Sequence, residues 1–119
     1  MASIQRKPFD QPDETRPVDK GVVEVVTING TTMMRTTFEP GWQWSECVKP
    51  IVGGESCQVN HVGYCISDRL HVRMDDGEEL EIGAGEASRI PPGHDAWVVG
   101  DEPYIALDFV GAEGYAKPS

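Results

Sequence analysis

Three histidines and three cysteines are the side chains of this 119-residue chain best suited to bind a metal ion or to move a proton. Imidazole nitrogen and thiolate sulfur are donors that Zn²⁺ and other late first-row metals accept well. Histidine can also act as a general acid or base near neutral pH. These six residues are His61, His71, His94, Cys47, Cys57 and Cys65. Which of them act together depends on the elements that carry them.

Side-chain alternation decides which of these residues can face one interior, because successive residues of a strand point to opposite faces. His61 and Cys65 fall on the same face of one expected strand. Cys47 and Lys49 share a face of an earlier expected strand. His94 lies at the mouth of a later one. We therefore expect His61 to point inward, close to His94 and Cys47.

Short apolar runs separated by turn signals supply the elements. Asn29-Gly30 and Asp75-Asp76-Gly77 are hairpin signals, and no amphipathic helix of ten residues or more is expected. Many short strands without helices predict an all-β sandwich or barrel. The expected strands are Val22–Ile28, Thr31–Phe38, Trp42–Val48, Val59–Ile66, Leu70–Met74, Glu79–Ile82, Glu86–Ile90, Ala96–Val99 and Tyr104–Val110.

Length and charge narrow the class of protein. A chain of 119 residues predicts one domain. The net charge of −10 disfavours nucleic acid and anionic membrane surfaces as partners. No apolar run is long enough to span a membrane, and no secretory signal is visible at the N-terminus. We therefore expect a cytoplasmic protein with reduced thiols.

The first 20 residues differ in composition from the rest of the chain. They are polar and carry Pro8, Pro12 and Pro17, which predicts an extended arm over 1–20 and a folded domain over 21–119. Such an arm can wrap a partner subunit or remain a loose tail. Together with several short strands whose edges need covering, it leads us to expect a homodimer.

The segment around Pro91-Pro92-Gly93 forces a tight corner between two apolar runs. Gly85, five residues and this corner together resemble the second signature of the cupin family. Gly41, five residues and then Cys47-Val48-Lys49 resemble the first. The resemblance covers roughly residues 39–110 and implies a cupin-type β-barrel, a double-stranded jelly roll.

The resemblance also implies a site inside the barrel, with departures from the family pattern. Cys47 and Lys49 stand where the family places two metal-binding histidines, and His61 matches its glutamate position. The later histidine position falls on Ala96, two residues after His94. The implied metal ligands are Cys47, His61 and His94, with Zn²⁺ the foremost divalent transition metal. The implied partner is a small organic molecule, expected to be an anion, that Lys49 would attract. Lys49, His61 and His94 are the candidate catalytic residues.

Other interpretations of the same residues stay open. Cys47 can be a small buried hydrophobe, and His94 can simply hydrogen-bond the turn or Asp95. Because the usual pair of histidines is missing, a metal-free module that binds or senses a small molecule is an alternative. Metal-free acid–base catalysis by His61 or His94 is another, so the sequence leaves open whether the protein is an enzyme.

The remaining candidates are expected to have structural roles. Cys57 lies in a loop rich in Gly and Ser and is expected to be a plain thiol, whereas Cys65 is expected to pack inside the barrel. His71 has the parity of a solvated strand residue. The three tryptophans, Trp42, Trp44 and Trp97, are expected to serve in packing.

Overall fold

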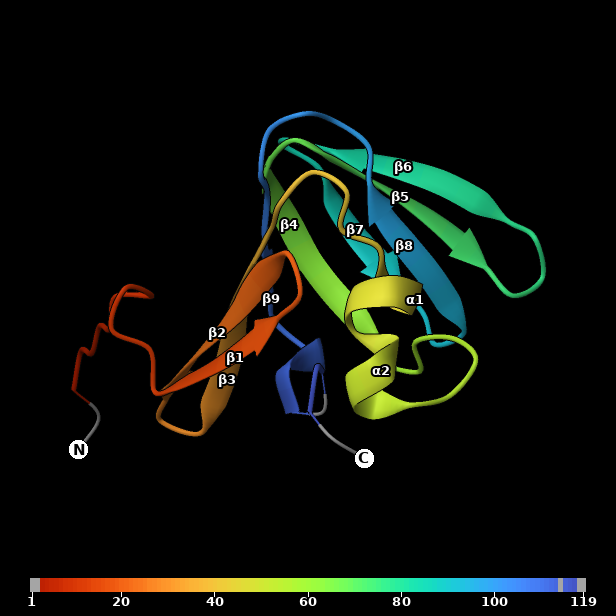
Figure 1. Cartoon of the computed structure of the whole chain (residues 1–119). Helices are drawn as coiled ribbons and strands as arrows, with labels where there is room; N and C mark the ends of the chain where they lie inside the picture. The colour runs from red at the N-terminus through yellow and green to blue at the C-terminus, as the bar shows by residue number, and fades with distance from the viewer. Residues whose placement is uncertain (1–2, 114, 118–119) are drawn as a thin grey trace.

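The computed structural model describes residues 3–113 and 115–117, and this part of the chain is built mainly from antiparallel β-strands (Figure 1). The elements are β1 Glu14–Val18, β2 Gly21–Ile28, β3 Thr31–Phe38, α1 Trp44–Cys47, α2 Lys49–Val52, β4 His61–Ser67, β5 Arg69–Met74, β6 Glu79–Gly83, β7 Ala87–Ile90, β8 His94–Val98, β9 Tyr104–Asp108 and the 3₁₀ turn η1 Gly111–Glu113. The all-β class expected from the sequence is confirmed.

Two antiparallel sheets enclose the interior. The larger sheet has the strand order β1-β2-β3-β9-β4-β7, and the smaller one has the order β6-β5-β8. Two isolated bridges, Gln43 with Trp97 and Cys57 with His94, tie the loops on either side of α1 and α2 to β8. Both short helices and the C-terminal turn η1 lie at the same end of the barrel (Figure 1).

Local turn chemistry explains the longest hairpin. Asn29 and Gly30 both have positive φ, 49° and 82°, as a two-residue hairpin turn whose twist matches its strands requires. Every residue of β2 consequently pairs with one of β3, from Gly21 opposite Phe38 to Ile28 opposite Thr31.

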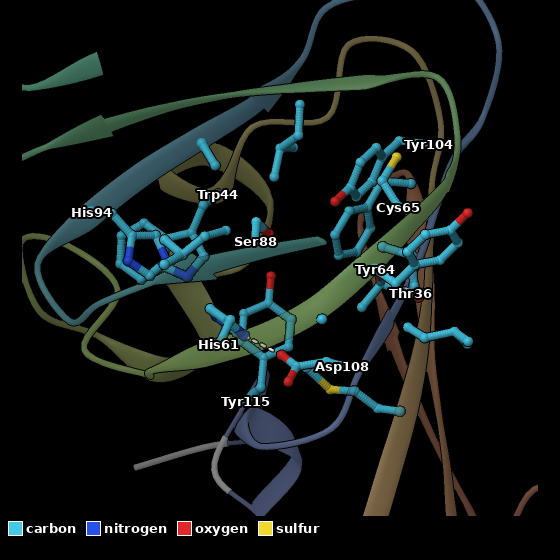
Figure 2. Close-up of a pocket in the computed structure, with 18 of the residues that line it drawn as sticks. Thr36, Trp44, His61, Tyr64, Cys65, Ser88, His94, Tyr104, Asp108 and Tyr115 are labelled. Carbon is cyan, nitrogen blue, oxygen red and sulfur yellow. Dashed lines mark hydrogen bonds and ion pairs between the residues drawn. The ribbon is translucent and has the colours of Figure 1, made fainter. Parts of the chain in front are cut away.

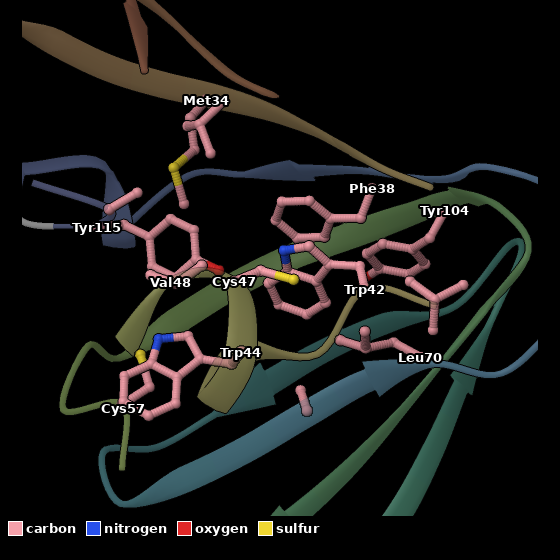
Figure 3. Packing of buried hydrophobic residues seen from close by; sticks show 14 of the residues in the cluster. Met34, Phe38, Trp42, Trp44, Cys47, Val48, Cys57, Leu70, Tyr104 and Tyr115 are labelled. Carbon is pink, nitrogen blue, oxygen red and sulfur yellow. The ribbon is translucent and has the colours of Figure 1, made fainter. Parts of the chain in front are cut away.

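The core fills the space between the sheets. Inward positions alternate along β3 and β8, where Met34, Thr36 and Phe38 are buried on one strand and Ala96 and Val98 on the other. In Figure 3 an aromatic group of Phe38, Trp42 and Tyr104 occupies one end of the interior, with the Phe38 and Trp42 rings stacked at 3.8 Å.

The segment 1–20, expected to be an extended arm, contributes an element to the larger sheet. Residues 14–18 form β1, which pairs with β2 from Glu14 opposite Val25 to Val18 opposite Gly21. The described residues contain no helix with the length and apolar character needed to cross a membrane.

Candidate metal site

Cys57, His61 and His94 meet inside the barrel, and their ligand atoms all lie within 4.8 Å of one another. Cys57 Sγ is 3.9 Å from His61 Nε2, and the two imidazole rings are 5.4 Å apart between centroids. Cys57 and His94 are 3% exposed, and the His61 side chain is 14% exposed. Three donors of the right types therefore lie close together among mostly buried residues.

Backbone pairing brings Cys57 to His94, although 37 positions separate them in the sequence. The Cys57 N–H donates to the His94 carbonyl at 2.7 Å, and the Gly93 N–H donates to the Cys57 carbonyl at 2.7 Å. The corner at Pro91-Pro92-Gly93 thus docks on the loop that precedes β4, and each donor is fixed by the segment that carries the other.

His94 is held in one tautomer. Its Nδ1 lies 2.7 Å from the Pro91 carbonyl oxygen, which can only accept, so Nδ1 carries the proton and Nε2 keeps its lone pair. Burial lowers the pKa of His94 below its ordinary value, against the opposing effect of the Pro91 hydrogen bond. A neutral imidazole with a fixed free nitrogen is the form that a metal binds.

His61 is held in the same tautomer by a carboxylate. Its Nδ1 donates to Asp108 Oδ2, which leaves Nε2 as the nitrogen that faces Cys57. Burial opposes ionisation of Asp108, but hydrogen bonds from His61 and from the N–H groups of Gly111 and Val110 outweigh it and lower the pKa of this carboxyl. A carboxylate behind a histidine is the usual support of a histidine that ligates a metal.

The third donor, Cys57, is protonated at neutral pH in the absence of a cation. Burial, with smaller contributions from Asp108 and Asp95, raises the pKa of the Cys57 thiol to about 11. Only the thiolate ligates metals, so a cation at this site has to displace a proton from sulfur.

A cavity of about 60 Å³ extends from the two histidines into the barrel. Figure 2 shows His94 and Trp44 at one end and Tyr104 and Cys65 at the other. The lining is mostly apolar, and none of the described residues that line it is a lysine or an arginine. The indole N–H of Trp42, which also lines the cavity, is buried and has no hydrogen-bond partner among the described residues.

The strand expected over residues 42–48 is wrong, because α1 occupies most of this region and α2 follows it directly. Asp95 on β8 accepts a hydrogen bond from the Ser45 N–H at 3.1 Å and another from the Gln43 side chain at 3.0 Å. Pro50 stands in the first turn of α2, where proline is favoured. A tertiary contact from a distant strand therefore stabilises turns that strand periodicity does not predict.

This change of element separates two of the expected site residues from the histidines. Cys47 is buried on α1, with its Sγ 3.9 Å from Asp19 Oδ2, and it does not belong to the group of donors. The Lys49 side chain is 37% exposed, approaches Glu55 at 3.9 Å and does not line the cavity. The structure thus brings His61 and His94 together, but not Cys47 or Lys49.

Cys57 and Asp108 are the members of the site that sequence reasoning missed. Cys57 precedes His61 by four residues, a spacing that could have marked it as a second donor. Asp108 is an acidic residue at an inward position of an otherwise apolar strand, which was a signal for a buried partner. Cys65 is buried in the barrel, as expected.

No family model and no curated protein matches the sequence. Among solved structures, the chain is similar to a protein of unknown function from Rhizobium leguminosarum, with a TM-score of 0.65 and 18% identity over 99% of this chain and 100% of that one. It is similar to an RmlC-like cupin from Shewanella frigidimarina, with a TM-score of 0.62 and 19% identity over 93% and 94% of the two chains.

A longer protein also matches: the oxalate decarboxylase of Lactobacillus farciminis, in a formate complex, with a TM-score of 0.60 and 18% identity. The match covers 86% of this chain and 32% of the decarboxylase, so the chain spans about a third of that enzyme's length. At such identities the likenesses concern the fold, and they agree with the barrel expected from the sequence.

Proposed function

Because the chain has the cupin fold, with a cysteine and two histidines gathered in its barrel, we propose that it binds a divalent transition metal, foremost Zn²⁺, and a small organic molecule beside it. The proposed ligands are Cys57, His61 and His94, with Cys57 in place of Cys47. The observation that carries the proposal is that all three ligand atoms lie within 4.8 Å of one another.

The donor set fits such an ion in type and nearly in distance. Zn–S bonds of about 2.3 Å and Zn–N bonds of about 2.0 Å place neighbouring donors of a tetrahedral site roughly 3.3–3.6 Å apart. Cys57 Sγ and His61 Nε2 are 3.9 Å apart, so small side-chain rotations suffice. Zinc sites with three protein ligands keep a fourth position for water or substrate.

The metal would supply a Lewis acid at one end of the cavity. The residues around it orient the two histidines. Asp108 keeps the proton of His61 on Nδ1, and the Pro91 carbonyl keeps that of His94 on Nδ1. The His61–Asp108 pair is also the group best placed to move a proton, since imidazole and carboxylate are directly hydrogen-bonded.

The cavity supports a small molecule with one polar or anionic group. Because no lysine or arginine of the described chain lines it, an anionic group would be bound by the cation rather than by Lys49. The unpartnered indole N–H of Trp42 offers a second polar contact, and the rest of the lining suits an apolar body.

The alternative is a metal-free module that binds or senses a small molecule. The mostly apolar lining and the protonated state of Cys57 favour it. In that case the His61–Asp108 pair could still act as an acid–base group on a bound ligand.

The metal content of the purified protein, with two cysteine variants, distinguishes these functions. We expect about one Zn²⁺, or another late first-row ion, per chain. Cys57→Ser should weaken metal binding at least tenfold, on the scale of lost metal interactions. Cys47→Ser removes a cysteine that is equally buried and should leave binding unchanged. A metal-free parent that stays metal-free after dialysis against Zn²⁺ would support the alternative.

The expected homodimer has a candidate surface on the larger sheet. We define the outer β4–β9 patch as Val62, Tyr64, Ile66, Leu107 and Phe109. Four of them are 38%, 43%, 46% and 47% exposed, and Leu107, which pairs with Tyr64, is partly buried. An apolar patch on the outer face of a sheet can pair with its own copy about a two-fold axis.

A further inference from the structure

We propose that Tyr115 limits the size of the molecule that can bind beside the metal donors, and that Arg16 holds Tyr115 in this position. The proposal rests on the proposed function for the ligand, but the barrier itself exists with or without a metal.

Tyr115 packs directly against His61 of the candidate metal site. Its ring meets the His61 ring edge-on, with 5.0 Å between centroids and 81° between planes. The residue is 4% exposed, and Figure 2 shows its ring beside His61 on the side of the C-terminal turn. Any ligand that coordinates next to His61 therefore has to fit around this ring.

Tyr115 also separates two spaces of different size. It lines the inner cavity of about 60 Å³ and an outer pocket of about 290 Å³. Trp44 is the other residue that lines both, and Cys57 lines the outer pocket. The two aromatic rings thus form a partition close to the candidate ligands, and removing one of them would join the spaces.

A buried arginine fixes the backbone of Tyr115. Arg16 on β1 is 7% exposed, and its Nη1 donates to the carbonyl oxygens of Ala112 at 2.5 Å and Tyr115 at 2.8 Å. Its remaining nitrogens donate to the Glu14 carboxylate at 2.7 Å and 3.1 Å. Hydrogen bonds to a charged group are stronger than neutral ones, so β1 anchors the C-terminal segment.

The start of the same C-terminal segment is fixed as well. The Gly111 N–H donates to Asp108 at 2.8 Å, and a Cβ at Gly111 would lie 2.7 Å from His61 Nδ1. Only glycine permits this approach. The segment that carries Tyr115 is therefore tied to the His61–Asp108 pair at one end and to Arg16 at the other.

The volume of the inner cavity predicts the largest molecule that can bind beside Tyr115. An apolar cavity of about 150 Å³ is known to hold benzene, whereas the inner cavity measures about 60 Å³. The parent should therefore admit formate and acetate beside the metal and reject benzoate. Tyr115→Ala should admit benzoate, while Tyr115→Phe keeps the ring and should keep the limit.

The experiment uses the full chain loaded with Co²⁺, whose visible absorption reports ligand binding. Formate, acetate and benzoate are titrated into the parent, Tyr115→Ala, Tyr115→Leu and Tyr115→Phe, after circular dichroism confirms that each is folded. We expect Tyr115→Ala to raise the affinity for benzoate relative to acetate at least tenfold and Tyr115→Phe to leave it unchanged. Arg16→Gln should shift the ratio in the same direction as Tyr115→Ala. An unchanged ratio in the folded Ala and Leu variants would overturn the proposal.

A second measurement separates this proposal from the metal site. If Co²⁺ does not bind, the proposed function fails, and the partition is tested on metal-free protein by acrylamide quenching of tryptophan fluorescence in a Trp97→Phe background. The two remaining tryptophans, Trp42 and Trp44, are each 2% exposed and both line the inner cavity. Tyr115→Ala should increase their quenching, and Tyr115→Phe should not. Equal quenching in all variants would show that Tyr115 is no barrier.

Discussion

Asp108 decides, at the scale of single residues, which nitrogen of His61 is open to a ligand. Its carboxylate accepts a hydrogen bond from His61 Nδ1–H and is itself held by two backbone N–H groups, from Val110 and Gly111. Pro91 does the same for His94 with a carbonyl. Both imidazoles are therefore preorganised by partners that lie outside the group of donors, which reduces the cost of ordering them around a ligand.

The raised thiol pKa of Cys57 predicts how metal affinity depends on pH. Because the thiol has a pKa of about 11, binding through the thiolate releases one proton at any lower pH, and affinity rises as pH rises. Between about pH 7.5 and pH 9 the apparent affinity for Zn²⁺ should increase roughly tenfold per pH unit. Competition with a chromophoric chelator measures it. Cys57→Ser should lose most of this slope, and an equally steep slope in that variant would show that another group releases the proton.

The positions of the two histidines could be predicted from the sequence, but those of the two cysteines could not. His61 and His94 were placed correctly, because alternation along a strand depends only on the strand itself. Cys47 was misplaced because its segment is helical in the structure. Cys57 reaches the site from a loop, through backbone hydrogen bonds to His94, and loop geometry has no period that a sequence reveals.

At the scale of elements, a hairpin whose own residues set its turn could be predicted, whereas a turn held by a distant residue could not. The hairpin at Asn29-Gly30 carries its own turn chemistry and was predictable with its register. The turn α1 is held by Asp95, which lies some 50 positions later and accepts a hydrogen bond from the Ser45 N–H. The pairing of β1 with β2 likewise places part of a polar, proline-containing segment in a sheet, which composition did not predict.

The hairpin of β5 and β6 predicts a pH-dependent contribution to stability. His71 on β5 hydrogen-bonds Glu79 at 2.7 Å and Glu81 at 3.3 Å, and its pKa is raised, chiefly by Glu79 and then by Glu81, against partial burial. A raised pKa in the folded state stabilises the fold below the ordinary histidine pKa, and this contribution is lost as pH rises through the raised value.

His71→Gln should therefore destabilise the protein more at about pH 5.5 than at about pH 9, by up to about 1 kcal/mol, the scale of surface ion pairs. Urea unfolding of parent and variant at both pH values measures the free energy of unfolding. The stacking of His71 on Trp97 is lost at both pH values, and the cation–π attraction of the protonated ring adds to the larger loss at low pH. A larger difference at the higher pH would contradict the assigned ion pairs.

For the whole molecule, we expect self-association through one face, from the distribution of charge and apolar surface. The net charge of −10 makes indiscriminate contacts between copies repulsive, so pairing requires a patch where apolar area outweighs that repulsion. The outer β4–β9 patch lies on two strands that are hydrogen-bonded to each other, which makes it continuous.

We expect a dimer of twice 13.1 kDa in light scattering at micromolar concentration. Tyr64→Lys should convert it to a monomer, because a two-fold axis brings both new charges into one apolar interface. Leu80→Lys is the matched control, since Leu80 is 64% exposed on β6 of the other sheet, and it should leave the dimer intact. A monomeric parent would refute the dimer. Dissociation by Leu80→Lys but not by Tyr64→Lys would instead move the interface to the smaller sheet, because only a buried lysine pair costs enough to separate the copies.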